Sequence, residues 1–347
     1  MGNISFGNSY LILSKFKFFP KITKEEKRRD ALTQEYNKIL DFEQSAEYQQ
    51  FIEDEQYFSS KKFQEDLKKL REEEANEEIE KLEAKKKAVE DFRNSKKYKE
   101  YLNNSKSGIF DELKAYKIVF EDNFEGSKLD REKWTTHYFG GENAMHIAYA
   151  LNSDFAFPTD GNNIDIQGGK ARISLKAEKT TGKVWKLPFG FVDQTFDYTT
   201  GLMNTAKSFR GKYGKIEAKV KITHSPNAAF IFNLSTEDML PYVDLFRIEE
   251  NVKKYSSGSL WGKELKNHQK AQGHFEGVDL SQDYFLFTFI WTPQKMIWKI
   301  NGETVNTQTT GIPDEEMFLS FNVRGLDEKI STPAAMDIAW VKWYQEV

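Results

Sequence analysis

The chain has 347 residues, no cysteine and a formal net charge of −4. This length accommodates two domains, and the lack of cysteine excludes disulfides, thiolate metal sites and cysteine nucleophiles. The mild negative charge creates no field that would attract nucleic acid, and no apolar run approaches the roughly 18 residues that a transmembrane helix needs. We therefore expect neither a nucleic-acid partner nor a transmembrane segment.

Residues 1–20 form an aromatic and mildly basic stretch, MGNISFGNSYLILSKFKFFP. Its apolar core, residues 10–13, is too short for a secretory signal peptide. A precursor that had already been processed would look the same, so we predict an N-terminal arm and leave export open. The compartment stays undecided, with an extracellular, cell-surface or assembly-associated location favoured.

Residues 21–112 are dense in Glu, Lys and Arg and poor in Gly and Pro. Glu-to-Lys pairs four residues apart, such as Glu77 and Lys81, support a helix surface. Apolar residues at spacings of three, four and seven form a narrow stripe that suits one partner helix. These residues are Leu67, Leu70, Ile79, Leu82, Val89 and Phe92. We predict a charged α-helical module, packed as hairpins or as an elongated coiled coil.

A weak repeat runs through this module: a serine followed three residues later by an aromatic residue. It occurs at Ser45, Ser60 and Ser95. Serine is a good helix N-cap, and the aromatic ring would then pack from the first turn, so we predict that helices restart at these positions. A module of this kind usually spaces, oligomerises or docks a domain. It therefore predicts self-association or attachment to a larger assembly.

Residues 113–347 are richer in glycine, aromatic and β-branched residues. Short alternating runs lie between turn signals, at residues 117–126, 162–178, 213–222, 228–235, 284–291, 295–302, 317–323 and 336–345. Many short strands without long helices between them predict an antiparallel β-sandwich. Asn301-Gly302 predicts a hairpin with a type I′ turn.

Four stretches of this half occur in the order that a known family shows. They are FEDNFEGSKLDREKW at 120–134, YTTGLMNTAKSFRGKYGKIEAKVKI at 198–222, DYFLFTFIWTPQKMIWKING at 283–302 and MDIAWVKWYQ at 336–345. Together they resemble glycoside hydrolase family 16, the laminarinase and lichenase group, over residues 117–347. The resemblance implies a jelly-roll β-sandwich of the concanavalin A-like lectin and glucanase type. It implies no activity by itself.

The stretch LPYVDLFRIEE, residues 240–250, corresponds to the family's catalytic strand, Glu-x-Asp-x-x-Glu. In the family the first Glu is the nucleophile and the last is the acid/base of a retaining hydrolysis, and a bulge turns all three acids towards the cleft. The resemblance places Tyr242 at the nucleophile position, Asp244 in the middle and Arg247 at the acid/base position. Tyrosine titrates near pH 10 and arginine is a poor proton donor, so the catalytic motif is degenerate.

Two interpretations of this strand stay open. A shifted register would use Asp244 as nucleophile and Glu249 as acid/base. It would leave Phe246 in the tuning position, and it would either turn side chains to the other face of the sheet or displace the strand by a full pair. Without the shift, Asp244 is expected to hold Arg247 in a salt bridge that can still bind sugar hydroxyls.

The resemblance also implies candidate sites outside this strand. Trp185, Trp261 and Tyr198 lie in segments that line the cleft of the resembling fold, and exposed aromatic faces stack on pyranose rings. Asp337 matches a closing-strand Asp that in some members helps hold a structural calcium ion. No cofactor is required.

Three functions follow from these observations. The leading prediction is a non-catalytic carbohydrate-binding or adhesion protein that presents its cleft to a β-linked glycan on a helical stalk. The second is an active endo-hydrolase of β-glucans or β-galactans that uses Asp244 and Glu249. The third is a structural scaffold subunit of a larger surface or virion-like assembly.

Overall fold

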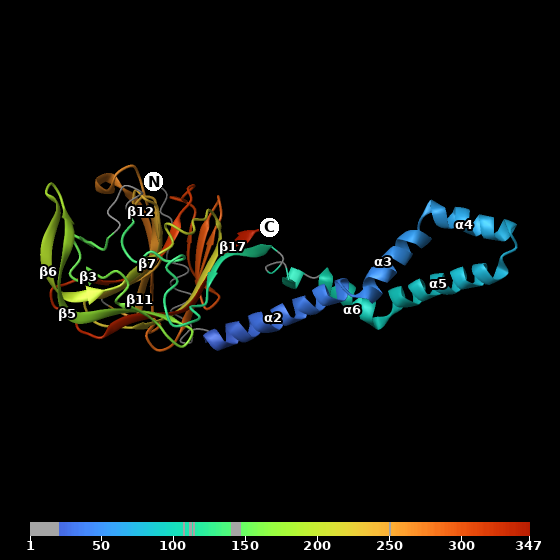
Figure 1. The fold of residues 1–347 in the computed structure, drawn as a ribbon, viewed down its shortest axis with the longest axis horizontal. Coiled ribbons are helices and arrows are strands. Elements are labelled where there is room, and N and C mark those ends of the chain that lie inside the picture. Colours follow the sequence, from blue (N-terminus) through green and yellow to red (C-terminus); the bar gives the residue numbers. More distant parts are fainter. Residues whose placement is uncertain (1–20, 107, 111–112, 114, 140–146, 250) are drawn as a thin grey trace. The chain divides into compact units, whose positions relative to one another are not determined.

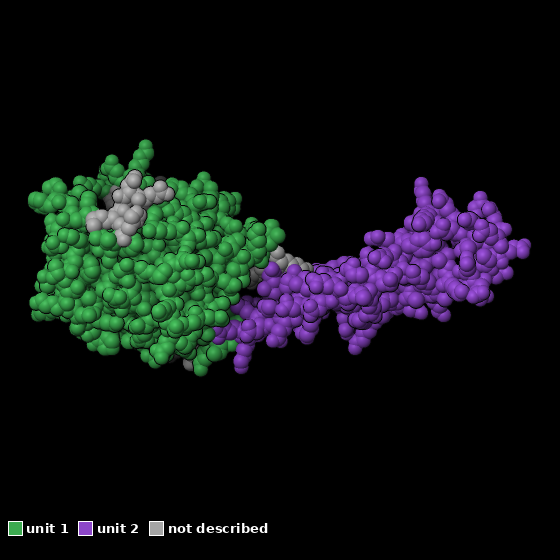
Figure 2. All heavy atoms as spheres, in the orientation of Figure 1, with its two compact units in different colours: residues 1–25, 116–347 green, residues 26–115 purple. Residues whose placement is uncertain are grey.

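The computed structural model describes residues 21–106, 108–110, 113, 115–139, 147–249 and 251–347. The predicted N-terminal arm, residues 1–20, lies outside the described residues. The chain divides into two compact units. One comprises Tyr116–Val347 with the described residues before Glu26, and the other comprises Glu26–Ala115 (Figure 2). Within the described ranges, every helix is too short or too polar to span a bilayer.

Helices form the smaller unit, and three of them start at the serine repeat. The helices are α2 (Ile22–Glu43), α3 (Ala46–Phe58), α4 (Lys61–Glu72), α5 (Asn76–Asn94) and α6 (Lys96–Ser105), followed by the short 3-10 helix η1 (Gly108–Phe110). The hydroxyls of Ser45, Ser60 and Ser95 accept the backbone N–H three residues on, at 3.2, 3.2 and 3.1 Å. These serines cap α3, α4 and α6, so the three predicted restarts are confirmed.

Aromatic side chains make the core of the helical unit. Phe51, Val89 and Tyr98 are buried together, and the rings of Phe51 and Tyr98 lie 4.9 Å apart. α5 packs against α3, α4 and α6. The helices thus pack as short hairpins around aromatic residues, and the elongated coiled coil stays a prediction.

The caps offer a test at two adjacent serines. Replacing Ser60 with alanine removes the cap of α4 and is expected to lower the free energy of unfolding of the helical unit by about 1 kcal/mol. Ser59 makes no side-chain hydrogen bond within the described part of the chain, so Ser59→Ala is the matched control and should leave stability unchanged. Urea unfolding followed by far-UV circular dichroism measures both variants. Equal effects at the two positions would contradict the capping role.

The larger unit is a sandwich of two mainly antiparallel sheets, in which two short strands pair parallel to their neighbours (Figure 1). In order across the six-stranded sheet lie β12 (Gln269–Glu276), β11 (Lys254–Trp261), β10 (Tyr242–Ile248), β9 (Ala228–Ser235), β16 (Phe318–Gly325) and β7 (Leu202–Asn204). The short 3-10 helix η2 (Leu265–Asn267) lies between β11 and β12 in the chain. The strand that holds the degenerate motif, β10, is therefore interior to its sheet.

The second sheet has eleven strands in the described part of the chain. Its main path is β15 (Glu303–Gln308), β14 (Met296–Ile300), β13 (Phe285–Trp291), β8 (Gly214–Thr223), β17 (Ala334–Glu346), β5 (Ala171–Lys186), β6 (Gly190–Thr200) and β3 (Phe157–Pro158). β1 (Tyr116–Asp122) pairs with β17, while β2 (Ala150–Leu151) and β4 (Ile164–Ile166) pair with β5. The predicted β-sandwich is confirmed.

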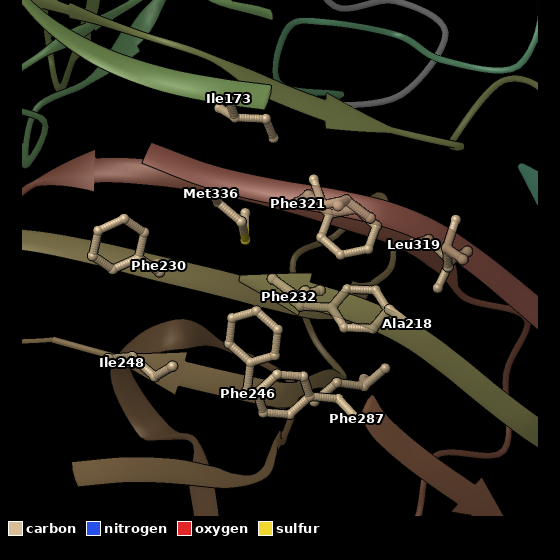
Figure 3. Close-up of a cluster of buried hydrophobic side chains, with 14 of the residues drawn as sticks. Ile173, Ala218, Phe230, Phe232, Phe246, Ile248, Phe287, Leu319, Phe321 and Met336 are labelled. Carbon is tan, nitrogen blue, oxygen red and sulfur yellow. The ribbon is translucent and has the colours of Figure 1, made fainter. Parts of the chain in front are cut away.

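A core rich in phenylalanine joins the two sheets. Figure 3 shows Phe232, Phe246 and Phe321 of the six-stranded sheet beside Phe287 of β13. The rings of Phe232 and Phe321 stack at 4.0 Å, and those of Phe246 and Phe287 lie 4.4 Å apart across the interface between the sheets. Because side chains alternate along a strand, this core uses one face of the six-stranded sheet and leaves its other face for a site.

Candidate functional site

A cleft of about 600 Å³ lies over the face of the six-stranded sheet that points away from the core. All six strands of the sheet contribute to its lining. One polar residue from each strand is Asn204, Asn233, Tyr242, Ser256, Gln272 and Ser320. Such a surface, wide and rich in amide and hydroxyl groups, suits a ligand with many hydroxyls.

A β-bulge in β10 decides which side chains reach this cleft. Against β9, Asp244 pairs with Asn233 and Phe246 with Phe232, which leaves Leu245 as the extra residue. The bulge shifts the alternation by one position. Tyr242, Asp244, Arg247 and Glu249 therefore all line the cleft, as the resemblance implied for the three motif positions.

Side chains behind the strand hold the bulge in place. Trp298 of β14 donates its indole N–H to the carbonyl of Asp244 at 3.0 Å, and the Tyr255 hydroxyl donates to the carbonyl of Leu245 at 3.0 Å. Gly258 lies opposite Asp244 with φ +149°, and a Cβ there would meet the Ala271 carbonyl oxygen at 2.1 Å. The bulge is thus fixed by the core and by close backbone packing.

The three motif residues form one hydrogen-bonded network. Arg247 donates from Nε to Asp244 Oδ2 at 2.9 Å and from Nη2 to Asp244 Oδ1 at 3.2 Å. Tyr242 donates its hydroxyl to Asp244 Oδ1 at 2.8 Å and accepts from Arg247 Nη2 at 2.9 Å. The salt bridge expected between Asp244 and Arg247 is present. Charge-assisted, paired hydrogen bonds of this kind fix both side chains.

Burial and mutual attraction set the ionisation of this network. Burial raises the pKa of Asp244, and Arg247 opposes that rise. Burial alone would lower the pKa of the Arg247 guanidinium. The interactions with Asp244 and Tyr242 are stronger than this effect, so the pKa is raised. Burial and the negative charge of Asp244 raise the pKa of the Tyr242 hydroxyl well above 10. Tyr242 is therefore a neutral phenol and Arg247 a permanent cation, so neither is suited to the role of the family's glutamates.

The second acid of the shifted-register alternative, Glu249, lies at the edge of this network. Its side chain is 46 % exposed, and Arg247 Nη1 lies 3.3 Å from its Oε1. Arg247 thus contacts both Asp244 and Glu249. A guanidinium bound to both carboxylates competes with any role of the pair as nucleophile and acid, since both oxygens of Asp244 accept its hydrogen bonds.

A second arginine–aspartate pair, which we did not predict, lies at another wall of the cleft. Arg324 donates to Asp154 Oδ1 from Nε at 2.9 Å and from Nη2 at 2.6 Å. The other oxygen of Asp154 accepts the Tyr138 hydroxyl at 3.1 Å and the backbone N–H of Leu151 at 2.7 Å. Tyr138, Leu151 and Arg324 all line the cleft. The sequence around Asp154 holds no motif that would have indicated this pair.

Among the described residues, one buried acceptor at the floor of the cleft has no hydrogen-bond partner. Asn322 of β16 is 8 % exposed and lines the cleft. Its Nδ2 approaches Asn233 Oδ1 at 3.4 Å, while its Oδ1 has no hydrogen-bond partner within the described part of the chain. Buried polar atoms are nearly always paired, so a small movement of the Asn322 amide would let this oxygen accept a hydrogen bond from a ligand in the cleft.

The aromatic candidates lie outside the cleft lining. Tyr198 packs against the core and its hydroxyl accepts the Ile330 N–H at 3.3 Å. Trp261 packs closely over Gly311, at which a Cβ would lie 2.2 Å from the indole ring. Trp185 is 41 % exposed on β5 and pairs with Leu151, which does line the cleft. Trp185 and Trp261 are thus each next to a lining residue, since Trp261 directly follows Leu260 in β11.

The metal candidate, Asp337, already has two cationic partners. Arg172 Nη1 donates to both of its oxygens at 3.0 and 2.9 Å, and Lys170 Nζ lies 3.5 Å away. Among the described residues no group of three or more His, Asp or Glu side chains could hold a metal ion. A carboxylate compensated in this way does not fit a calcium ligand. Calcium at Asp337 therefore stays a prediction without structural support.

The jelly-roll sandwich, with a bulged strand interior to the sheet that forms its cleft, defines the concanavalin A-like lectin and glucanase class. The sequence profile of glycosyl hydrolases family 16 matches residues 151–342, and the chain belongs to this family. The helical unit lies outside the matched range.

Two known proteins are similar to this chain in sequence. Glucan endo-1,3-beta-glucosidase A1 from Niallia circulans is 22 % identical over 272 residues, which are 66 % of this chain and 38 % of that protein. The beta-glucanase of Bacillus licheniformis is 29 % identical over 85 residues, 22 % of this chain and 34 % of its own length. The chain thus spans well under half of either relative.

Solved structures extend the comparison. The catalytic domain of an endo-1,3-beta-glucanase (laminarinase) from Thermotoga petrophila superposes with a TM-score of 0.54 at 20 % identity, covering 67 % of this chain and 99 % of that one. The kappa-carrageenase of Pseudoalteromonas carrageenovora gives 0.53 at 16 % identity, covering 67 % and 96 %. At these identities the likeness establishes the fold alone.

Proposed function

We propose that residues 113–347 bind a neutral, β-linked glycan in the cleft of the six-stranded sheet and do not hydrolyse it. The observation that supports this most is the network of Tyr242, Asp244 and Arg247. As in the family's catalytic strand, a bulge turns these three side chains towards the cleft. Retaining hydrolysis needs two carboxyl groups about 5–5.5 Å apart, but the corresponding positions carry a phenol and a guanidinium.

The charges of the cleft favour a neutral ligand. Arg247 and Arg324 both line it, and each is neutralised by a buried aspartate, Asp244 or Asp154. No cation is left over in these two pairs to select a sulfate or carboxylate group. Fixed N–H and carboxylate groups beside side-chain amides are instead suited to hydrogen bonds with sugar hydroxyls.

A binding experiment tests this role through the unused acceptor. Calorimetric titration of the full chain with laminarin should give binding, and Asn322→Leu, which removes that acceptor, should weaken it about tenfold. Asn123 is exposed and lies outside the cleft lining, so Asn123→Leu is the matched control and should bind like the natural chain. If laminarin, lichenan and agarose all fail to bind, the proposal is wrong.

Hydrolysis with Asp244 and Glu249 is the second candidate. It is favoured by the names of the relatives, which are glucanases, and by the half-exposed carboxyl of Glu249 in the cleft. This candidate requires Arg247 to release Asp244 when the substrate binds. Product formation that disappears in Glu249→Gln would select it.

We further propose that residues 21–112 serve as a spacer or docking module for the β unit, at a cell surface or outside the cell. Support comes from the composition of this unit, which has a charged surface and a small aromatic core and lies outside the family match. Sedimentation of the full chain would show self-association. A role as a scaffold subunit would be favoured if the chain assembles but binds no glycan.

A further inference from the structure

The β5–β6 hairpin, at one edge of the β unit in Figure 1, has two different faces. On one face Ala150, Val184 and Phe196 are buried together, with Phe157 and Val192 packed against them. This face anchors the hairpin. On the other face Trp185 is 41 % exposed, and at the tip Leu187 and Phe189 are 80 and 79 % exposed. Exposed apolar side chains gathered in this way mark a binding surface.

The exposed face is continuous with the wall of the cleft. Leu151 pairs with Trp185, and Trp185 pairs with Phe191, so these three side chains lie on the same face of the sheet. The Trp185 and Phe191 rings lie 4.9 Å apart, and those of Phe191 and Tyr149 5.2 Å apart. Tyr149 and Leu151 themselves line the cleft. A row of rings thus leads from the cleft to the hairpin.

We propose that this row, Tyr149, Phe191 and Trp185, is a second glycan subsite that extends the cleft. The inference rests on the proposed function and makes it more specific: the ligand is a long β-glucan chain that occupies the cleft and the hairpin together. Aromatic faces are suited to the apolar faces of pyranose rings. The charged pair nearest to the row on this face, Lys183 and Asp193, is mutually compensated, so the row selects for chain length and not for charge. The continuity of the row with the cleft favours a glycan over a lipid surface.

The test compares a short and a long ligand on the full chain. Trp185→Ala should weaken the binding of laminarin roughly five- to tenfold and leave the binding of laminaritriose, which the cleft alone can hold, unchanged. Trp185→Phe should recover most of the loss. Ile118 is 46 % exposed on β1, so Ile118→Ala is the matched control for an apolar surface residue. Unfolding midpoints of all variants show whether the hairpin remains folded.

The outcomes separate this inference from the function on which it rests. If laminaritriose binds in the cleft and Trp185→Ala weakens both ligands equally or neither of them, the second subsite is wrong and the cleft stands. If neither ligand binds to the natural chain, both proposals are wrong. Binding of anionic phospholipid vesicles that is lost in Trp185→Ala, with laminarin binding intact, would show that the hairpin contacts lipid and would also overturn the subsite.

Discussion

Replacing Arg247 with methionine is expected to lower the free energy of unfolding by about 3 kcal/mol. The Asp244 side chain is 3 % exposed, and without Arg247 its charge would keep, among the described residues, only the Tyr242 hydroxyl as a hydrogen-bonding side-chain partner. Urea unfolding of the β unit measures the change. The double variant Asp244→Asn/Arg247→Met removes both charges and should recover a large part of the loss, because no uncompensated buried charge remains.

Lys183 provides the control for Arg247. Its ion pair with Asp193 has side chains 41 and 65 % exposed, so Lys183→Met should cost no more than about 1 kcal/mol. Equal losses of stability in the two single variants would contradict the structural role of the buried pair.

Laminarin binding should also be lost in Arg247→Met, since the guanidinium lies in the cleft.

The same variant has a defined pH dependence. The pKa of Asp244 is raised by burial and held down by Arg247, so removing Arg247 raises it further. A raised pKa means that the folded protein binds a proton more readily than the unfolded chain, and stability is regained as the pH falls. Arg247→Met should therefore gain more stability than the natural chain on acidification from neutrality towards the ordinary aspartate value of 3.8. If the free energy of unfolding changes with pH in the same way in Arg247→Met and in the natural chain, Arg247 does not hold down the pKa of Asp244.

Replacing Arg324 with methionine is also expected to lower the free energy of unfolding by about 3 kcal/mol. The Asp154 side chain is 4 % exposed, and it bonds Tyr138 and the backbone of Leu151 as well as Arg324. Loss of the cation leaves this charge buried and loosens the wall at which the cleft meets the hairpin. We expect weaker laminarin binding in addition to lower stability, both measured as for Arg247.

The variant Asp154→Asn separates the two consequences of Arg324→Met, which are an uncompensated buried charge and a looser cleft wall. It removes the buried charge but keeps a side chain that can accept hydrogen bonds, so Asp154→Asn/Arg324→Met should be more stable than Arg324→Met alone. If Arg324→Met is as stable as the natural chain, Arg324 does not hold the wall as described.

Much of the fold could be predicted because its signals are local. Alternating runs marked most of the long strands, and serine caps marked three of the helix starts, since both depend on residues close in the chain. β11 and β12 were not predicted. Their segments, KYSSGSLW and QKAQGHFE, are polar because one face lines the cleft, so the usual apolar alternation is weak.

The site could be predicted only where it lies within one strand. The resemblance to the family's bulged catalytic strand implied that Tyr242, Asp244 and Arg247 share a face, and the opposite charges of Asp244 and Arg247 then indicated their salt bridge. Arg324 and Asp154 are 170 residues apart, and only the folded chain brings them together. The resemblance suggested Tyr198 and Trp261 for the cleft, but Tyr198 packs on the core and Trp261 on Gly311, because this chain directs those aromatic side chains elsewhere.

The release of reducing ends from laminarin and lichenan, with calorimetric binding measured on the same preparation, tests the central claim most directly. We predict binding with no release of reducing ends, because a phenol and a guanidinium occupy the positions of the two catalytic carboxyl groups. Product released by the natural chain and abolished in Glu249→Gln would contradict this account and show that the shifted acids are active.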